Sequence, residues 1–217
     1  MMMQHNSEID VRAAGPNMDH VLSHLEFLAK PNAGLDPEYK LEIRAISEGA
    51  PPRSLLINPT NDDGLEKALV FVEQTNRQGF NVYVTVNPAR PLGPNVKDQD
   101  IIQTTFLFAD ADERGAVTQV KNDFIHKPDA YVCTGTKPHE RGHFYWRLEE
   151  PVQPTDFEQW KELMQNIAKR HGCDPQICNS SRIMRLGGTV SYPSKAKRAR
   201  GYQTELTAFY EYGGMNG

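Results

Sequence analysis

Two aspartates one residue apart follow an apolar run that has the length of a β-strand. The run ends at Ala109, and the carboxylates are Asp110 and Asp112. Alternate side chains of a strand lie on one face, so the two carboxylates should project together. Like charges held close together repel each other unless a cation lies between them. Carboxylate oxygens suit hard divalent ions such as Mg²⁺, and a pair of such ions can promote phosphoryl transfer. The alternative is an ordinary strand end that leads into a turn.

A second group of polar residues follows a glycine-rich turn. His143, Tyr145 and Arg147 alternate with large apolar residues, which predicts a strand with one polar face. Arg141 and Lys137 lie shortly before it, and phosphate oxygens accept hydrogen bonds from all of these cationic groups. The pattern therefore indicates an anion site, and the alternative is a β-hairpin whose histidine faces solvent.

The third group begins at Asp174. Arg182 follows it, and Arg185 comes three residues later, so on a helical turn the two arginines would share a face. Two adjacent guanidinium groups favour a bound anion, and arginine is well suited to phosphate recognition. Gly187 and Gly188 would let the backbone approach a ligand closely. The alternatives are a helix cap at Asp174 and solvent-exposed charge at the arginines.

The charge of the chain is unevenly distributed. The 217 residues have a formal net charge of −4, so the protein as a whole is not a basic nucleic-acid binder. Between residues 179 and 201, however, the sequence has no acidic residue and has a cluster of cationic ones. These are Arg182, Arg185, Lys195, Lys197, Arg198 and Arg200. A mobile, solvated basic loop is the alternative to a phosphate-binding segment here.

The cysteines indicate a reducing compartment. Cys133, Cys173 and Cys178 form an odd and sparse set, unlike a disulfide framework. Together with His171, the last two could suggest zinc, but a tetrahedral site needs four ligands, and we expect no zinc. No apolar run approaches the roughly 20 residues that span a membrane, and residues 1–17 lack the apolar core of a signal peptide. We therefore expect a cytoplasmic protein without a membrane partner.

Strands alternate with helices along the chain, and some connections look like hairpins. This predicts an α+β (mixed α/β) fold with one central, mostly antiparallel sheet flanked by helices. Residues 1–17 are expected to be disordered, and residues 18–217 to form one catalytic domain in which 18–60 could be a small subdomain. The expected helices are 19–29, 62–78, 115–126 and 154–171, and the expected strands are 39–47, 53–58, 80–86, 106–110, 130–134, 143–148 and 202–210.

Taken in order, these groups resemble the archaeo-eukaryotic primase superfamily, in particular the RepB-type primase domains and primase-polymerases of plasmids and phages. The resemblance spans about residues 80 to 205. It rests on Asp110-Ala111-Asp112, His143-Phe144-Tyr145-Trp146-Arg147-Leu148 and Arg182-Ile183-Met184-Arg185-Leu186-Gly187-Gly188-Thr189. The chain departs from the family pattern at Gly187, which replaces a proline, and at Arg141, which stands where serine is common.

The resemblance implies an RRM-like catalytic core that makes primers on single-stranded DNA from NTPs or dNTPs, with two Mg²⁺ or Mn²⁺ ions. The implied catalytic and metal-binding residues are Asp110, Asp112 and Asp174. His143 and Arg182 are the implied contacts to the nucleotide, and Arg185 and Lys195 are further contacts to nucleotide or template. Glu205 is a rival for the third acidic position, but the spacing between Asp174 and Arg182 fits the family better.

The remaining expectations concern partners and rival functions. We expect the basic residues Lys197, Arg198 and Arg200 to contact the template, and a replicative helicase, fused or separate, to be a partner. One rival is a nicking-type replication initiator, which would need a histidine pair and a nucleophilic tyrosine. Trp146, and not a second histidine, follows His143-Phe144-Tyr145, which counts against this function. The other rival is a non-catalytic protein that binds single-stranded DNA.

Overall fold

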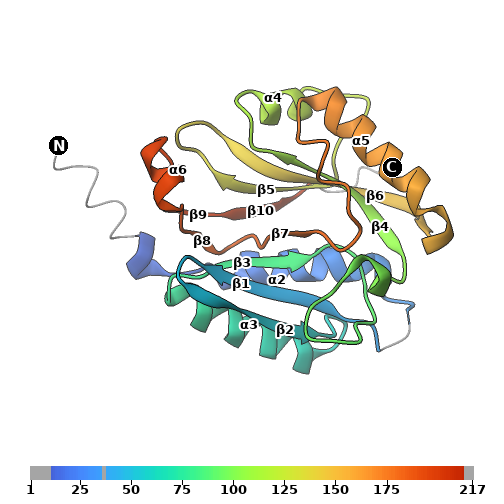
Figure 1. Cartoon of the computed structure of the whole chain (residues 1–217), viewed down its shortest axis with the longest axis horizontal. Coiled ribbons are helices and arrows are strands. Elements are labelled where there is room, and N and C mark those ends of the chain that lie inside the picture. The colour runs from blue at the N-terminus through green and yellow to red at the C-terminus, as the bar shows by residue number, and fades with distance from the viewer. Residues whose placement is uncertain (1–10, 36–37, 213–217) are drawn as a thin grey trace.

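The strands form two four-stranded sheets that face each other across the molecule (Figure 1). The structure is a computed structural model and describes residues 11–35 and 38–212. The first sheet has the order β2 (Ala50–Ile57), β1 (Leu41–Ser47), β3 (Asn81–Thr85) and β7 (Ile183–Arg185). The second has the order β10 (Ala208–Glu211), β5 (Ala130–Gly135), β6 (Arg141–Val152) and β4 (Thr104–Ala111). A two-stranded ladder joins β8 (Val190–Ser191) to β9 (Glu205–Leu206).

Every strand pair among the described residues is antiparallel. The α+β fold class is therefore confirmed, but the strands are divided between two sheets instead of forming a single central one. The predicted final strand over 202–210 is also divided. Its first part, β9, pairs with β8, whereas β10 pairs with β5 of the second sheet.

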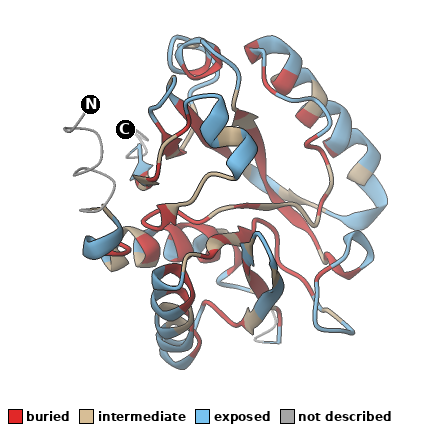
Figure 2. Cartoon of the chain, turned by 60° about the vertical axis from the view of Figure 1, so that its left-hand side comes forward, coloured by how far each residue is buried: buried red, intermediate tan, exposed pale blue. Residues whose placement is uncertain are grey.

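Helices cover the outer faces of both sheets. Helix α3 (Asp62–Arg77) packs on the first sheet, and α4 (Ala116–Lys121) and α5 (Phe157–His171) pack on the second. Figure 2 shows exposed residues along the outer sides of the helices and buried residues along the strands. Short 3₁₀ turns occur at Lys30–Asn32, Asp98–Asp100 and Pro154–Asp156. No helix in the described part of the chain is both long and apolar enough to cross a membrane.

Helix α2 (Met18–Ala29) links the layers, because it contacts both α3 and β10. The ring of Phe27 on this helix lies 5.1 Å from that of Phe106 on β4 and 5.4 Å from that of Phe209 on β10. Phe106 also connects this cluster to α5, because its carbonyl accepts a 3.0 Å hydrogen bond from Nε1 of Trp160 on that helix. One hydrophobic core thus runs from the first sheet to α5.

The segment before α2 is ordered from residue 11, so the expectation of disorder over 1–17 is wrong for residues 11–17; residues 1–10 lie outside the described residues. Residues 11–14 are helical. The amide of Asn17 donates to the carbonyl of Gly188 at 2.7 Å. Gly188 has a φ of 85°, and a Cβ on it would lie 2.4 Å from the carbonyl oxygen of Asn17. Only glycine permits this contact.

Two helix ends differ from their predicted positions, because local side-chain hydrogen bonds determine where these helices begin or end. Helix α2 begins at Met18 because the side chain of Asn17, and not that of Asp19, caps it. Helix α4 ends at Lys121 and does not reach residue 126. There the carboxylate of Asp123 accepts hydrogen bonds from the amides of Ile125 and His126, at 3.0 and 3.1 Å, and these compete with helical bonds.

Candidate active site

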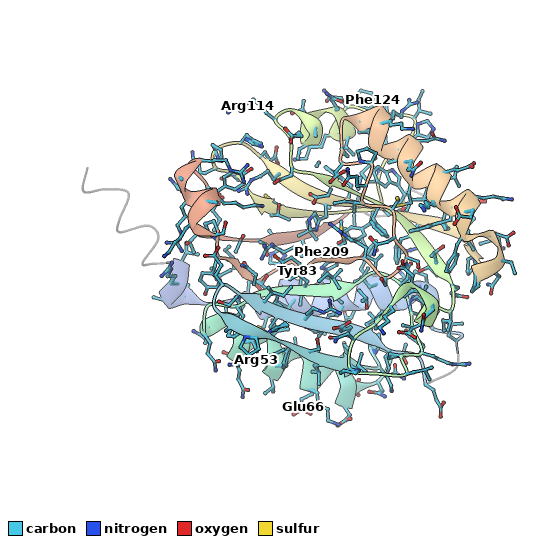
Figure 3. The ribbon with its side chains drawn as sticks, in the orientation of Figure 1. Arg53, Glu66, Tyr83, Arg114, Phe124 and Phe209 are labelled. Atoms are coloured by element: carbon cyan, nitrogen blue, oxygen red, sulfur yellow. The ribbon has the colours of Figure 1, made fainter. Side chains whose placement is uncertain are left out.

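A cavity of about 280 Å³ lies where the two sheets approach each other. Figure 3 labels Tyr83 on the first sheet and Phe209 on the second, and it shows Arg114 and Phe124 at the outer edge of the molecule. The cavity is lined by Asn81, Tyr83, Asp110, Asp112, Thr134, Arg141, His143, Arg185, Ser191, Tyr192, Pro193, Ser194, Lys197, Tyr202 and Gln203. Both sheets and the segment around helix α6 (Lys195–Ala199) therefore contribute to it.

The carboxylates of Asp110 and Asp112 both line this cavity, as the alternation along the strand predicts. Burial, and next the neighbouring charge of Asp112, raises the pKa of Asp110 to about 6. Arg182 and Lys197 oppose that rise, whereas Asp174 adds to it. The Nζ of Lys197 lies 3.9 Å from Oδ2 of Asp112. The two carboxylates thus form an acidic site that is short of positive charge.

The two rivals for the third acidic position lie in different surroundings. Asp174 is exposed beside the end of β4, where its amide is 3.4 Å from the carbonyl oxygen of Asp110. Glu205 is engaged by four donors: the amide and hydroxyl of Thr136, the amide of Lys137 and the guanidinium of Arg141. Asp174, whose Oδ1 accepts from the amide of Gln176 at 2.9 Å, is therefore the less engaged of the two acids.

The donor set at Asp110 and Asp112 fits a hard divalent cation, because it consists of carboxylate oxygens whose mutual repulsion a cation would relieve. Within the described ranges, no group of three or more carboxylate, imidazole or thiolate side chains is arranged to hold a metal ion. A full coordination shell would therefore include oxygens from substrate or water, which is common for Mg²⁺.

His143 is buried between the sheets. Its Nδ1 accepts a 3.2 Å hydrogen bond from the amide of Arg185, and its Nε2 lies 3.7 Å from Oδ1 of Asp110. Burial, and next the charge of Arg185, lowers the pKa of this histidine well below its ordinary value. The neutral ring therefore carries its proton on Nε2, on the side of Asp110. It can donate a hydrogen bond there without adding charge.

Arg185 is fixed by the first sheet. Its guanidinium donates to Oδ1 of Asn81 at 2.7 Å and to the hydroxyl of Tyr83 at 3.0 Å, and it lies over the Tyr83 ring at 4.7 Å. The expectation that Arg182 and Arg185 share the face of a helical turn is wrong. Ile183–Arg185 is strand β7, which pairs with β3, and in a strand residues three apart point to opposite faces.

Arg182 consequently does not line the cavity, although it is close enough to Asp110 to lower the pKa of that carboxyl group. Its Nε is buried and has no hydrogen-bond partner among the described residues. A buried guanidinium nitrogen without a partner is costly. Arg182 is thus the residue of this segment that most needs an additional acceptor.

Arg141 lies in the cavity wall, where the family pattern has serine. It is 6% exposed, and Nη2 donates to the carbonyl of Lys137 at 2.8 Å and to Oε2 of Glu205 at 3.2 Å. Its guanidinium lies 4.2 Å from the centre of the Tyr202 ring. Gly135 leaves the room for it, because a Cβ there would be 2.1 Å from Nη2. These contacts therefore fix the positive charge of Arg141 in the wall of the cavity.

The basic run 195–200 is not a loop. Ser194 caps a short helix, α6, by accepting a hydrogen bond from the amide of Lys197 at 3.2 Å. The helix turns its cations to different sides. Lys197 lines the cavity with the aspartates, Arg198 donates to the carbonyl of Pro193 at 3.0 Å, and Arg200 lies 5.2 Å from the Tyr202 ring.

Lys195 is exposed and does not line the cavity, so it lies apart from His143 and Arg185. Several lining residues that the sequence analysis did not select come from both sheets and from the segments around α6: Asn81, Tyr83, Thr134, Tyr192, Ser194 and Tyr202. Tyr83 had a usable signal, since it lies on the face of β3 opposite the buried Val82 and Val84. The others carry no local pattern.

Comparisons with known proteins give matches among solved structures only. No protein-family model matches the sequence, and no curated protein does. The primase-polymerase domain of cyanophage S-2L matches with a TM-score of 0.61 and 23% sequence identity, and 91% of each chain is covered. The primase RepB′ matches with a TM-score of 0.58 and 14% identity over 89% of this chain and 57% of that one.

A structure of the catalytic domain of RepB′ in complex with initiator DNA matches with a TM-score of 0.52 and 14% identity, over 86% of this chain and 84% of that one. These neighbours are members of the superfamily that the sequence resembles, so the predicted resemblance is confirmed at the level of fold. The chain therefore has the fold of the archaeo-eukaryotic primases and primase-polymerases.

Proposed function

We propose that the protein is a primase or primase-polymerase that joins nucleotides on a single-stranded DNA template. The observation that carries the proposal is the cavity between the sheets. There an aspartate pair, a neutral histidine and held arginines lie together. Nucleotidyl transfer needs such a combination, because the reacting phosphate is anionic and its charge must be stabilised in the transition state.

Asp110 and Asp112, with Asp174 beside them, would hold Mg²⁺ or Mn²⁺. Bound divalent ions would supply activation of the attacking 3′-hydroxyl and neutralisation of the phosphate oxygens. The carboxylates would fix the position of the reaction at the end of β4, a strand that pairs with β6 along most of its length. A rigid strand is a suitable support, since small displacements of catalytic groups cost much activity.

Side chains around the aspartates, from both sheets, would bind the triphosphate of the incoming nucleotide. His143 would donate from Nε2, and Arg141 and Arg185 would provide positive charge from the second and the first sheet. The guanidinium of Arg182, whose buried Nε has no hydrogen-bond partner among the described residues, would gain an acceptor if the phosphates reach it. Lys197 would exchange its contact with Asp112 for one with the nucleotide, while Arg198 and Arg200 would face the template.

The rival function of nicking is disfavoured by the position of Tyr145. A nicking tyrosine must reach a phosphodiester, but this side chain is fully buried, and burial raises its pKa. The replication context of a plasmid or phage and the partnership with a helicase remain part of the proposal. They rest on the functions named for the structural neighbours, a phage primase-polymerase and the primase RepB′.

Primer synthesis tests the proposal directly. The protein would be incubated with circular single-stranded DNA, labelled NTPs or dNTPs, and Mg²⁺ or Mn²⁺, in the absence of any primer. We expect labelled oligonucleotides of short length from the wild type and none from the Asp110→Asn variant at equal concentration. A protein that binds the DNA with normal affinity yet makes no product with either nucleotide set and either metal would be a non-catalytic binding protein.

A further inference from the structure

A second cavity, of about 420 Å³, adjoins the first. The two share four lining residues, Asn81, Tyr192, Pro193 and Ser194. On its far side the second cavity is bounded by the end of the β1–β2 hairpin and by α6. A polymer that has one unit in the first cavity can therefore reach the second one over Tyr192 without crossing the core.

Two arginines border the second cavity without a carboxylate partner among the residues that the structure describes. Arg198 of α6 donates only its Nε, to the carbonyl of Pro193 at 3.0 Å, and its side chain is otherwise exposed. The guanidinium of Arg12 lies 5.7 Å from the centre of the Tyr192 ring. Glu48 is the acidic residue in the lining, and its carboxylate accepts from the backbone amide of Lys195. The balance of charge there favours an anion.

Tyr192 is held rigidly between the two cavities. Its hydroxyl donates to the carbonyl of Asn76 at 2.9 Å, and its amide donates to Oδ1 of Asn81 at 2.8 Å. The ring is partly exposed and lines both cavities. A fixed aromatic ring flanked by arginines is the combination that proteins use to bind single-stranded nucleic acid, with the base on the ring and the backbone along the cations.

We propose that the second cavity binds the nucleotide of a single DNA strand adjacent to the one at the first cavity. Its base packs on Tyr192, and its phosphate lies between Arg12 and Arg198. The inference rests on the proposed function for the identity of the strand, but it concerns binding alone. It assigns Arg198 a role separate from that of Lys197, although both belong to the same short helix.

The test measures binding of a fluorescent oligo(dT) by anisotropy over a range of KCl concentrations, without metal or free nucleotide. The double variant Arg12→Gln/Arg198→Gln should lower the slope of log affinity against log salt by about 0.7, since the one phosphate that both arginines contact contributes about 0.7 on a single strand. The control is Lys127→Gln/Lys169→Gln, which removes the same charge from exposed positions away from both cavities. It should keep the wild-type slope.

The stacking contact is tested with Tyr192→Leu and Tyr192→Phe. The leucine variant should bind about tenfold more weakly, and the phenylalanine variant, which keeps the ring, should bind like the wild type. Melting temperatures identify any variant that fails to fold. Equal slopes for both double variants, or equal affinities for the leucine and phenylalanine variants, would overturn the proposal. Because the assay contains no reaction, a protein that lacked primase activity would still give a clear answer.

Discussion

The two sheets make unlike contributions to the site. The second sheet provides Asp110 and, just beyond the end of β4, Asp112, together with His143 and Arg141 on β6. The first sheet provides neutral and cationic groups: Asn81, Tyr83 and Arg185. In the proposed reaction, the second sheet would perform the chemistry at the phosphate, and the first would hold the nucleotide in place. Neither sheet has the full set of groups.

This division makes the site depend on how the sheets are docked. The 3.2 Å hydrogen bond from the amide of Arg185 to Nδ1 of His143 joins the two sheets directly. Substitutions on the second sheet should therefore lower kcat, whereas those on the first sheet and its neighbours should mainly raise KM for the nucleotide. The expected effects below are ordered from the largest to the smallest.

The largest effect is expected from the aspartate pair. Asp110→Asn or Asp112→Asn should lower kcat for primer synthesis about a thousandfold or more, because the lost charge would act on the transition state. Circular dichroism should show an unchanged fold, since the substitution relieves a repulsion. Primer-extension assays with Mn²⁺ measure kcat. If either variant retained more than a few per cent of activity, the two-metal role would not hold.

Asp174→Asn should come next, with a loss similar to that of the pair. Glu205→Gln should raise KM only a few-fold and leave kcat nearly unchanged, because Glu205 holds Arg141 and does not face the aspartates. Steady-state kinetics of both variants on a primed template would show whether kcat or KM changes in each. The opposite ranking would assign the third acidic position to Glu205.

A smaller effect is expected beside the first sheet. Charge-assisted hydrogen bonds contribute about 1.5–3 kcal/mol each, so Arg182→Ala should raise the nucleotide KM roughly ten- to a hundredfold. The oligonucleotide affinity of the same variant should stay at the wild-type level, which filter binding can measure. Arg182→Lys serves as the matched control and should recover part of the loss. A fall in kcat without a change in KM would contradict the division between the sheets.

The smallest effect concerns stability and pH. The pKa of Asp110 is raised to about 6 from an ordinary value of 3.8. The folded state therefore binds the proton more tightly than the unfolded state, and this carboxyl group costs stability as the pH rises from about 4 to about 6. The full cost is at most roughly 3 kcal/mol.

Asp110→Asn removes that cost, so the variant should be more stable than the wild type at pH 7 and similar to it at pH 4. Urea unfolding in the presence of EDTA at the two pH values measures the difference. An excess of Mg²⁺ at pH 7 should reduce it, because the cation stabilises the charged wild-type pair. An equal gain at both pH values would show that the effect comes from packing and not from charge.

The sequence predicts most elements because their signals are local. Alternation identifies β3 and β6, a short apolar run identifies β4, and the apolar spacing identifies α3 and α5. The prediction was wrong for the segment from Arg182 to Arg185. A spacing of three residues fits a helical turn, but the segment pairs with β3 and is therefore a strand. Short elements such as β7 and α6 depend on distant partners and on a cap, and a local window does not include those partners.

The difference between local signals and distant partners also decides which residues of the site could be predicted from the sequence. Asp110, Asp112 and His143 lie in recognisable segments, so type and spacing were sufficient to select them. Arg141 looked like a departure from the family pattern, and its contacts with Glu205 and Tyr202, both far away in sequence, explain where its guanidinium is held. Tyr192 and Tyr202 line the cavity through chain segments that come together only in the folded protein.

The histidine acceptors between the sheets also have a consequence for hydrogen exchange. The amides of Arg185 and Gly187 donate to imidazole nitrogens, those of His143 and His24, at 3.2 and 3.1 Å. Backbone amides in strands usually exchange slowly because another strand's carbonyl protects them, but these two are protected by side chains of other layers. Their exchange rates, relative to that of the amide of Leu186 between them, which donates to the carbonyl of Val82 at 3.0 Å, would report the separation of the layers.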